Sequence, residues 1–165
     1  MRFLFFIIPV IFISASCSNN VENAVDYNEV IVLSYEKVAD MEDNLMFHIL
    51  MSDSIKFDSS YTEFLNQIES SKEEIESLGS FNTYSEFQEA ALSMLDMYKD
   101  KAAQRLVELM NFMKGGSTED VMDSTAYDVY FEDKMFELDS IIEDAFKRFE
   151  NEQKKFAAKF GFSLM

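Results

Sequence analysis

The stretch from Phe131 to Phe160 reads FEDKMFELDSIIEDAFKRFENEQKKFAAKF and carries the clearest periodicity in the chain. Its apolar side chains recur every three or four residues, which is the spacing of one face of an α-helix. That stripe comprises Phe131, Met135, Leu138, Ile142, Ala145, Phe149, Phe156 and Phe160. Ser117, with Asp120 three residues later, supplies a helix start further upstream. We therefore predict a C-terminal helix that begins at Ser117 and, at about 1.5 Å per residue, spans roughly 60 Å.

Three more amphipathic stretches precede this helix. They cover residues 24–51, 60–78 and 84–113, with a predicted loop over 52–59. The single proline, Pro9, lies N-terminal to all of these stretches, so no proline interrupts the helices. Four such helices joined by short polar turns favour an all-α fold. The predicted architecture is an antiparallel up-down-up-down four-helix bundle with a long C-terminal helix.

Local signals mark the ends of these helices. A Ser or Thr followed three residues later by Glu forms a capping box, in which each side chain satisfies a free backbone N–H at a helix start. Two such boxes are Ser60 with Glu63 and Thr83 with Glu86. Glycine readily takes the left-handed conformation that ends a helix. Gly79 and Gly115–Gly116 are therefore predicted to end the second and third helices.

The charge balance excludes one class of partner. Lys and Arg number 14 against 31 Asp and Glu, which gives a formal net charge of −17. A protein that binds nucleic acid through phosphate contacts needs a basic face, so no nucleic-acid partner is expected. The same charge argues against a domain that lies flat on anionic lipid.

The first 22 residues carry a targeting pattern. Met1–Arg2 is positively charged, Phe3–Ile13 is apolar, and the small residues Ser14–Ser16 directly precede Cys17. This order is typical of a bacterial lipoprotein signal, in which the peptidase cuts before a cysteine whose thiol carries the lipid. The common pattern has Leu where this chain has Ser14. The alternative is an ordinary secretory signal with an incidental cysteine.

Lipidation of Cys17 defines the expected organisation of the chain. We predict a signal peptide over residues 1–16, a lipidated tether over 17–22 and a helical bundle domain over 23–165. Stable anchoring through lipid needs more than one acyl chain, which a triacylated cysteine provides without a transmembrane helix. Ser18, in place of an aspartate after the cysteine, favours the outer membrane, on its periplasmic face or at the cell surface.

Several segments carry a resemblance to known proteins. They are YNEVIV at 27–32, LGSF at 78–81, EAALSMLDMYKD at 89–100 and FENEQKKFAAKFGFSL at 149–164. In these segments the chain resembles a family of helical bacterial surface lipoproteins of unknown function, found in Bacteroidota and spirochaetes. The resemblance implies a lipid-anchored, all-α envelope protein, and it implies no catalytic residue.

Few side chains are of the types that catalyse reactions or bind metal ions. One Cys and one His exclude a disulfide framework, a cysteine zinc site and most histidine metal sites. His48 lies on the apolar stripe of the first helix, where a packing role is favoured over a ligand or acid–base role. The third helix carries two pairs of methionines with a spacing of three residues, Met94 with Met97 and Met110 with Met113. Their thioether sulfurs are soft ligands of the kind that Cu(I) prefers. Methionine is also a flexible core filler, and this interpretation is favoured.

Aromatic residues are abundant, with 17 Phe and 7 Tyr. Most of the phenylalanines fall on apolar stripes and are expected in the core. Tyr127, Tyr130 and Phe131, together with Phe57 in the predicted loop, could instead form an exposed patch. A core position is favoured for these four as well.

These observations favour a non-enzymatic envelope lipoprotein, attached to the membrane through Cys17. We expect it to act as a protein-interaction or accessory subunit with an envelope protein as partner, and to need no cofactor, metal or catalytic residue. The alternative is a bundle that binds a hydrophobic ligand in a cavity lined by Phe and Met. An enzyme would require a pocket around His48 into which Asp or Glu side chains converge.

Overall fold

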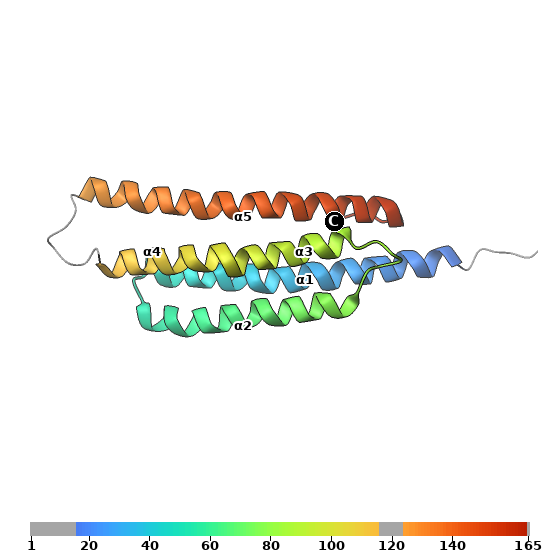
Figure 1. Ribbon diagram of the computed structural model, residues 1–165, viewed down its shortest axis with the longest axis horizontal. Helices are drawn as coiled ribbons and strands as arrows, with labels where there is room; N and C mark the ends of the chain where they lie inside the picture. The colour runs from blue at the N-terminus through green and yellow to red at the C-terminus, as the bar shows by residue number, and fades with distance from the viewer. Residues whose placement is uncertain (1–15, 116–123, 165) are drawn as a thin grey trace, which may run out of the picture.

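The computed structural model describes residues 16–115 and 124–164, with side chains over 20–115 and 128–164. The helices are α1 (Ser16–Leu50), α2 (Ser54–Leu78), α3 (Glu86–Met97), the π-helical segment η1 (Tyr98–Ala102), α4 (Ala103–Gly115) and α5 (Ser124–Phe160). Because α3, η1 and α4 follow one another without a break, they form one rod. Four rods therefore lie side by side, and successive rods run in opposite directions (Figure 1). This arrangement confirms the predicted all-α bundle with a long C-terminal helix.

Helix α1 is longer than predicted. It begins at Ser16, whereas the sequence indicated a start at Ala24, so the segment 17–22 that was expected as a tether is helical. The prediction of this start was wrong because a polar composition was taken as non-helical. No proline or glycine lies between Ser16 and Asn23 to stop the helix from extending.

Helix α2 also begins earlier than predicted. Its N-cap is Asp53, whose carboxylate Oδ1 accepts a hydrogen bond from the backbone N–H of Lys56 at 3.1 Å. The predicted loop over 52–59 and the predicted start at Ser60 are therefore wrong. An aspartate N-cap satisfies one free N–H group of the first turn, which is enough to favour a helix start at this position. The early start places Phe57 on the inner face of α2, where it is buried.

Glycine ends α2 as the sequence predicts. Gly79 has φ +64, and its N–H donates to the carbonyl oxygen of Glu76 at 3.1 Å. A Cβ at this position would meet no other atom, so the requirement is for the backbone conformation and not for space. The chain then turns through an isolated antiparallel bridge between Phe81 and Tyr84. Helix α3 begins at Glu86, and its N-cap Ser85 makes no side-chain capping bond, so the predicted Thr83 box does not form.

Helix α5 buries its apolar stripe unevenly. Leu138, Phe149, Phe156 and Ala157 are buried, and three of these four lie in the C-terminal half of the helix. In the N-terminal half, all described apolar side chains except Leu138 are half-buried or exposed. The predicted start at Ser117 lies outside the described residues. The helix therefore packs closely at one end of the bundle and more loosely at the other.

The closely packed end is held by an aromatic cluster centred on Phe156. Its members are Phe156, Tyr27, Phe81, Tyr84, Phe87, Phe160 and Phe162, and each of the other six has its ring centroid 4.8–5.9 Å from that of Phe156. The rings come from α1, the turn before α3, α3 itself, and the C-terminal part of the chain. This cluster therefore joins segments that are far apart in the sequence.

We predict that Phe156→Ala destabilises the protein by about 3–5 kcal/mol, because it removes the ring that all other members of the aromatic cluster contact. Phe136→Ala on the same helix is the matched control, since Phe136 is 73% exposed and its removal should change the free energy of unfolding by less than about 0.5 kcal/mol. Urea denaturation followed by circular dichroism measures both. Similar losses in the two variants would contradict the assigned role of Phe156.

Candidate functional site

Cys17 lies in the first turn of α1, at the end of the bundle that also contains the aromatic cluster. Its side chain is outside the range whose side chains are described. Among the described residues, no helix is both long enough and apolar enough to cross a membrane.

His48 lies near the C-terminal end of α1 and is 8% exposed. Its ring is 5.8 Å from that of Phe47, and its backbone carbonyl accepts a hydrogen bond from the N–H of Asp53. The Nδ1 atom is buried and has no hydrogen-bond partner within the described part of the chain. His48 therefore packs beside the turn between α1 and α2. Its burial agrees with the favoured packing role, whereas the hydrogen bond expected for such a histidine is not seen at Nδ1.

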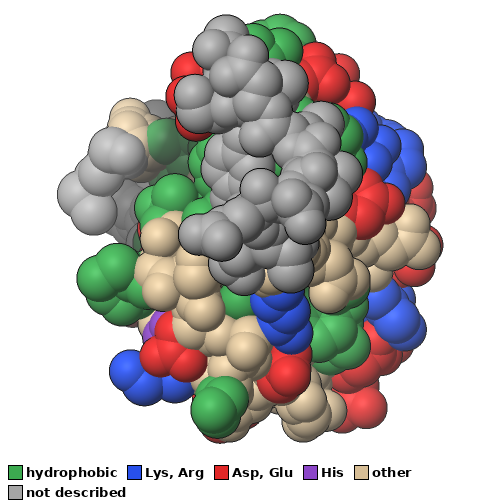
Figure 2. All heavy atoms as spheres, turned by 90° about the vertical axis from the view of Figure 1, so that its left-hand side faces the viewer, with side chains coloured by type: hydrophobic (Ala, Val, Ile, Leu, Met, Phe, Trp, Pro, Cys, Tyr) green, Lys and Arg blue, Asp and Glu red, His purple; other side chains and the backbone are tan. Residues whose placement is uncertain are grey.

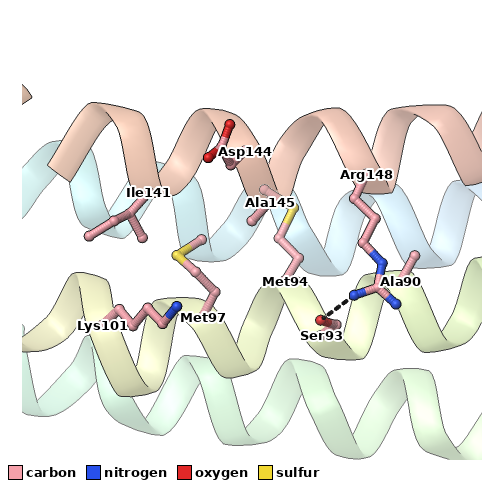
Figure 3. Close-up of a pocket in the computed structure, with 9 residues that line it drawn as sticks. All are labelled: Ala90, Ser93, Met94, Met97, Lys101, Ile141, Asp144, Ala145 and Arg148. Atoms are coloured by element: carbon pink, nitrogen blue, oxygen red, sulfur yellow. Dashed lines mark hydrogen bonds between the residues drawn. The ribbon is translucent and has the colours of Figure 1, made fainter. Parts of the chain in front are cut away.

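The methionine pairs of the third rod contribute to packing. Met94, Met97 and Met110 are buried, and Met113 is half-buried against the core. Met94 and Met97 point toward Ile141 and Ala145 of α5 (Figure 3). In the described ranges no group of three or more His, Cys, Asp or Glu side chains is placed to hold a metal ion. The burial of these methionines agrees with the favoured core interpretation.

A small groove of about 320 Å³ lies between α3, η1 and α5 beside these methionines. Lys101 and Arg148 flank it together with Asp144, and Arg148 Nη1 donates to Ser93 Oγ at 3.4 Å (Figure 3). Positively and negatively charged side chains both line this groove, so it favours neither an anionic nor a cationic ligand.

The π-helical segment η1 turns Tyr98 into the core. An extra residue in a helical turn shifts the register of the side chains that follow, and such turns are frequent at functional sites. Here Tyr98 is 1% exposed and packs near Tyr35 of α1 and Phe64 of α2, with ring centroids 6.3 and 6.2 Å away. Burial raises the pKa of the Tyr98 hydroxyl far above its usual value. Tyr98 is therefore uncharged at all physiological pH values.

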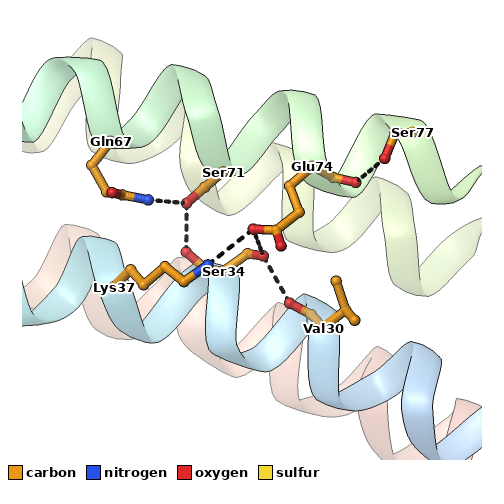
Figure 4. Close-up of polar contacts among 7 residues, drawn as sticks. All are labelled: Val30, Ser34, Lys37, Gln67, Ser71, Glu74 and Ser77. Atoms are coloured by element: carbon orange, nitrogen blue, oxygen red, sulfur yellow. Dashed lines mark hydrogen bonds and ion pairs between the residues drawn. The ribbon is translucent and has the colours of Figure 1, made fainter.

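A polar seam joins α1 to α2. Ser71 is fully buried, and its hydroxyl donates to the backbone carbonyl of Ser34 at 2.7 Å and accepts from Gln67 Nε2 at 3.0 Å (Figure 4). Ser34 Oγ lies within hydrogen-bond distance of Glu74 Oε2, at 2.8 Å, and Lys37 Nζ is 3.1 Å from the same oxygen. These bonds from Ser34 and Lys37 hold the pKa of Glu74 below its usual value. Each buried polar atom has a partner, so this seam fixes the register of the two helices and offers no open site.

A second groove, wider than the one beside the methionines, lies between α1 and α5 and has a volume of about 530 Å³. We call it the α1/α5 groove. Its lining side chains are Tyr35, Glu42, Asp43, Met46 and Leu50 from α1, and Met135, Asp139, Ile142, Glu143 and Phe146 from α5. The floor is therefore apolar, and carboxylates stand on both sides. No lysine or arginine lines it.

Glu42 is the carboxylate whose environment is most altered. Glu42 is half-buried, and this loss of contact with water raises its pKa to about 7, with smaller contributions from the negative charges of Asp43 and Asp139. Within the described part of the chain, neither Glu42 nor its two acidic neighbours forms an ion pair. A half-buried carboxylate beside two others, without a cation, is electrostatically unfavourable when it is ionised.

Several exposed apolar side chains lie toward the end of the bundle opposite Cys17. They are Phe47, Leu50 and Met51 at the end of α1, Ile55 at the start of α2, and Val129, Tyr130 and Phe136 in the first turns of α5. We call this set the distal tip. Figure 2 looks onto this end and shows hydrophobic side chains among acidic ones at the surface. Tyr130 is 38% exposed and packs on Phe112 of α4, with ring centroids 4.4 Å apart.

The favoured core position of the four aromatic residues is confirmed for Phe57, which is buried, whereas Phe131 is half-buried and Tyr130 is 38% exposed, so a core position is wrong for Tyr130. The side chain of Tyr127 lies outside the described range. Apart from Tyr130, which was named as a possible exposed residue, sequence reasoning missed the members of the distal tip, because it assigned most apolar side chains to the core. It also missed the α1/α5 groove, since the carboxylates of the two helices are about a hundred residues apart.

Comparison of the chain with family models, with curated proteins and with solved structures gives no match. The resemblance to helical bacterial surface lipoproteins therefore stays a prediction.

We predict that Glu42→Gln stabilises the protein above neutral pH. The pKa of Glu42 is 4.5 in the unfolded reference and about 7 in the fold, so the fold binds this proton more tightly. Its contribution to stability is therefore complete below pH 4.5 and is lost as the pH rises through 7. A neutral glutamine avoids that loss of stability. The expected difference in the free energy of unfolding is about 1–2 kcal/mol, after allowance for the partial exposure of Glu42.

Urea unfolding at pH 5 and pH 8 measures this effect, and Glu36→Gln on the exposed side of α1 is the control. We expect the Glu42→Gln midpoint to exceed the wild-type midpoint at pH 8 but not at pH 5. An equal change at both pH values would contradict the altered ionisation of Glu42.

Proposed function

We propose that this chain is a non-enzymatic, lipid-anchored protein of the bacterial cell envelope that serves as a protein-interaction or accessory subunit. Cys17 carries the lipid in this proposal, and the distal tip contacts an envelope protein. The observation that carries the proposal is the placement of exposed apolar side chains at the end of the bundle opposite Cys17. Apolar side chains that remain exposed among polar neighbours are available for contact with another protein, and contiguous surfaces of this kind mark protein-contact sites.

The length of the bundle supports this arrangement. Helix α1 has 35 residues, which at about 1.5 Å per residue places its C-terminal end roughly 50 Å from Cys17. The net charge of −17 repels the bundle from anionic lipid headgroups. A lipid on Cys17 would then hold one end at the membrane, while the distal tip faces away from it. The serine after Cys17 favours the outer membrane as the location.

Burial of the only histidine supports a non-enzymatic role. His48 packs at a turn, and no carboxylate is hydrogen-bonded to it within the described residues. The carboxylate with the most altered pKa, Glu42, lies in a different place, in the α1/α5 groove. The proposal therefore assigns no catalytic residue, cofactor or metal.

A role in binding a hydrophobic ligand is the second candidate function. The apolar floor of the α1/α5 groove, with Met46, Met135 and Ile142, is the observation that favours it. Carboxylates on both sides of the groove favour a cationic partner over an uncharged apolar molecule. Native mass spectrometry of the purified protein tests this candidate, since a retained small molecule would appear as a fixed increase in mass.

We predict that Cys17→Ser abolishes attachment of lipid to the protein. The reason is that Cys17 directly follows the predicted signal peptide, and its thiol is the group that would carry the lipid. Fractionation of the bacterium that encodes the protein, with metabolic labelling by an alkyne fatty acid, measures both localisation and lipid. Retention of label by the Cys17→Ser protein would contradict the assigned anchor.

We predict that the distal tip contacts the partner. A photoreactive amino acid in place of Ile55, which is 85% exposed, should cross-link one dominant envelope protein in intact cells. The same amino acid in place of Leu33, 47% exposed and nearer to Cys17, is the matched control. The cross-link should disappear when Phe47→Glu is added. Equal cross-linking from positions 55 and 33 would contradict a contact surface at the tip.

A further inference from the structure

The α1/α5 groove has a chemical character that the distal tip lacks. Its floor is apolar, with Met46, Met135 and Ile142, so it favours apolar side chains. Its walls are acidic on both sides. Glu42 and Asp43 stand on α1, and Asp139 and Glu143 stand on α5.

These carboxylates are poorly compensated within the protein. Glu143 pairs with Lys147 at 2.7 Å, and that lysine is more than half exposed. Glu42, Asp43 and Asp139 have no ion pair within the described residues, and burial together with mutual repulsion raises the pKa of Glu42 to about 7. A positively charged group that entered the groove would relieve this repulsion.

From this juxtaposition we propose that the α1/α5 groove binds a cationic amphipathic helix of a protein partner. One face of that helix would place apolar side chains on the groove floor, and Lys or Arg on either side of that face would contact the acidic walls. This is the mode in which an amphipathic helix docks into a hydrophobic groove. The inference rests on the proposed protein-interaction function and names the chemistry of the partner segment.

The dimensions of the groove suit a short helix. On α5 it extends from Met135 to Phe146, and the eleven residue-to-residue steps of this helical segment rise about 16 Å, or three turns. A docking helix of three to four turns covers that distance. Leu50 belongs both to the groove and to the distal tip, so the groove opens toward the exposed end of the bundle.

Charge also excludes a second copy of this chain as the occupant. Each copy carries a net charge of −17, and two acidic walls brought together would repel. The segment FAAKF near the C-terminus belongs to the aromatic-cluster end and is packed in the fold. The occupant is therefore a basic segment from a different protein.

Binding of such a helix should release a proton. Glu42 faces Asp43 on its own helix, Asp139 on α5, and the hydroxyl groups of Tyr35 and Tyr98. Burial raises the pKa of both tyrosines, so neither ionises near neutral pH. A cation in the groove favours ionised Glu42, and binding should therefore strengthen as the pH rises from 6 to 8.

The experiment uses the full lipidated protein in detergent and three synthetic 14-residue peptides. The first has leucines on one helical face flanked by lysines, the second has the same residues in scrambled order, and the third has glutamates in place of the lysines. Fluorescence anisotropy at about 0.15 M salt, where exposed charges are screened within ~8 Å, measures their affinities. We expect the first peptide to bind at least tenfold more tightly than either control.

Two charge-reversal variants on α5 locate the site. Asp139→Lys places a cation in the groove and should weaken binding of the first peptide at least tenfold. Asp133→Lys changes the net charge by the same amount at an exposed position outside the groove lining, and it should change affinity less than threefold. Circular dichroism confirms that both variants are folded, and Phe146→Ser, at a position 38% exposed, tests the apolar floor if Asp139→Lys unfolds.

Each outcome bears on the proposal. Equal weakening by Asp139→Lys and Asp133→Lys, or equal binding of the ordered and scrambled peptides, would show attraction to the overall negative charge and would overturn the groove proposal. Release of a proton on peptide binding, if the Glu42→Gln variant abolishes it, would support the groove proposal.

If the cross-link from position 55 persists in cells while the ordered peptide fails to bind, the interaction function stands and the groove proposal fails. If the peptide binds in the groove and no cross-link forms, the groove chemistry stands and the tip contact fails.

Discussion

Packing of aromatic rings around Phe156 is the interaction on which the rest of this structure depends. A helix of 37 residues with many charged side chains gains most of its stability from burying one apolar face. For α5, that burial is concentrated at its C-terminal half, where Phe149 and Phe156 are buried against α1 and α3. The hydroxyl of Tyr27 adds a hydrogen bond to the carbonyl of Gly79 at 2.8 Å, which ties the cluster to the end of α2.

Close packing at one end leaves the other end more open. The N-terminal half of α5 is only half-buried, and there the α1/α5 groove and the distal tip are found. The bundle is thus asymmetric along its length. The end that contains Cys17 is closed by aromatic rings, and the opposite end exposes apolar and acidic side chains. This asymmetry supports the proposed function, in which one end is held and the other makes contacts.

The acidic residues contribute little to the stability of this fold. Ion pairs such as Lys147 with Glu143 and Lys154 with Glu150 lie on exposed helix faces, where such pairs stabilise by a fraction of a kcal/mol. Glu74 is different because it joins the polar seam between α1 and α2. When Glu42 is ionised, it lowers the free energy of unfolding. The excess of negative charge is therefore better explained by what the surface attracts and repels than by the stability of the fold.

The helices and their buried faces could be predicted from the chain alone, because a 3.6-residue apolar period is a local property. The stripe from Phe131 to Phe160 and the stop at Gly79 were both recovered in this way. Helix starts were less predictable. Asp53 caps α2 ahead of the Ser60 box, and α1 continues back to Ser16, since several polar residues can begin a helix and tertiary packing selects among them. Which side chains share a groove was decided by the tertiary structure alone. Glu42 and Asp139 become neighbours only because α1 and α5 lie side by side, and no local pattern encodes a pairing between positions almost a hundred residues apart.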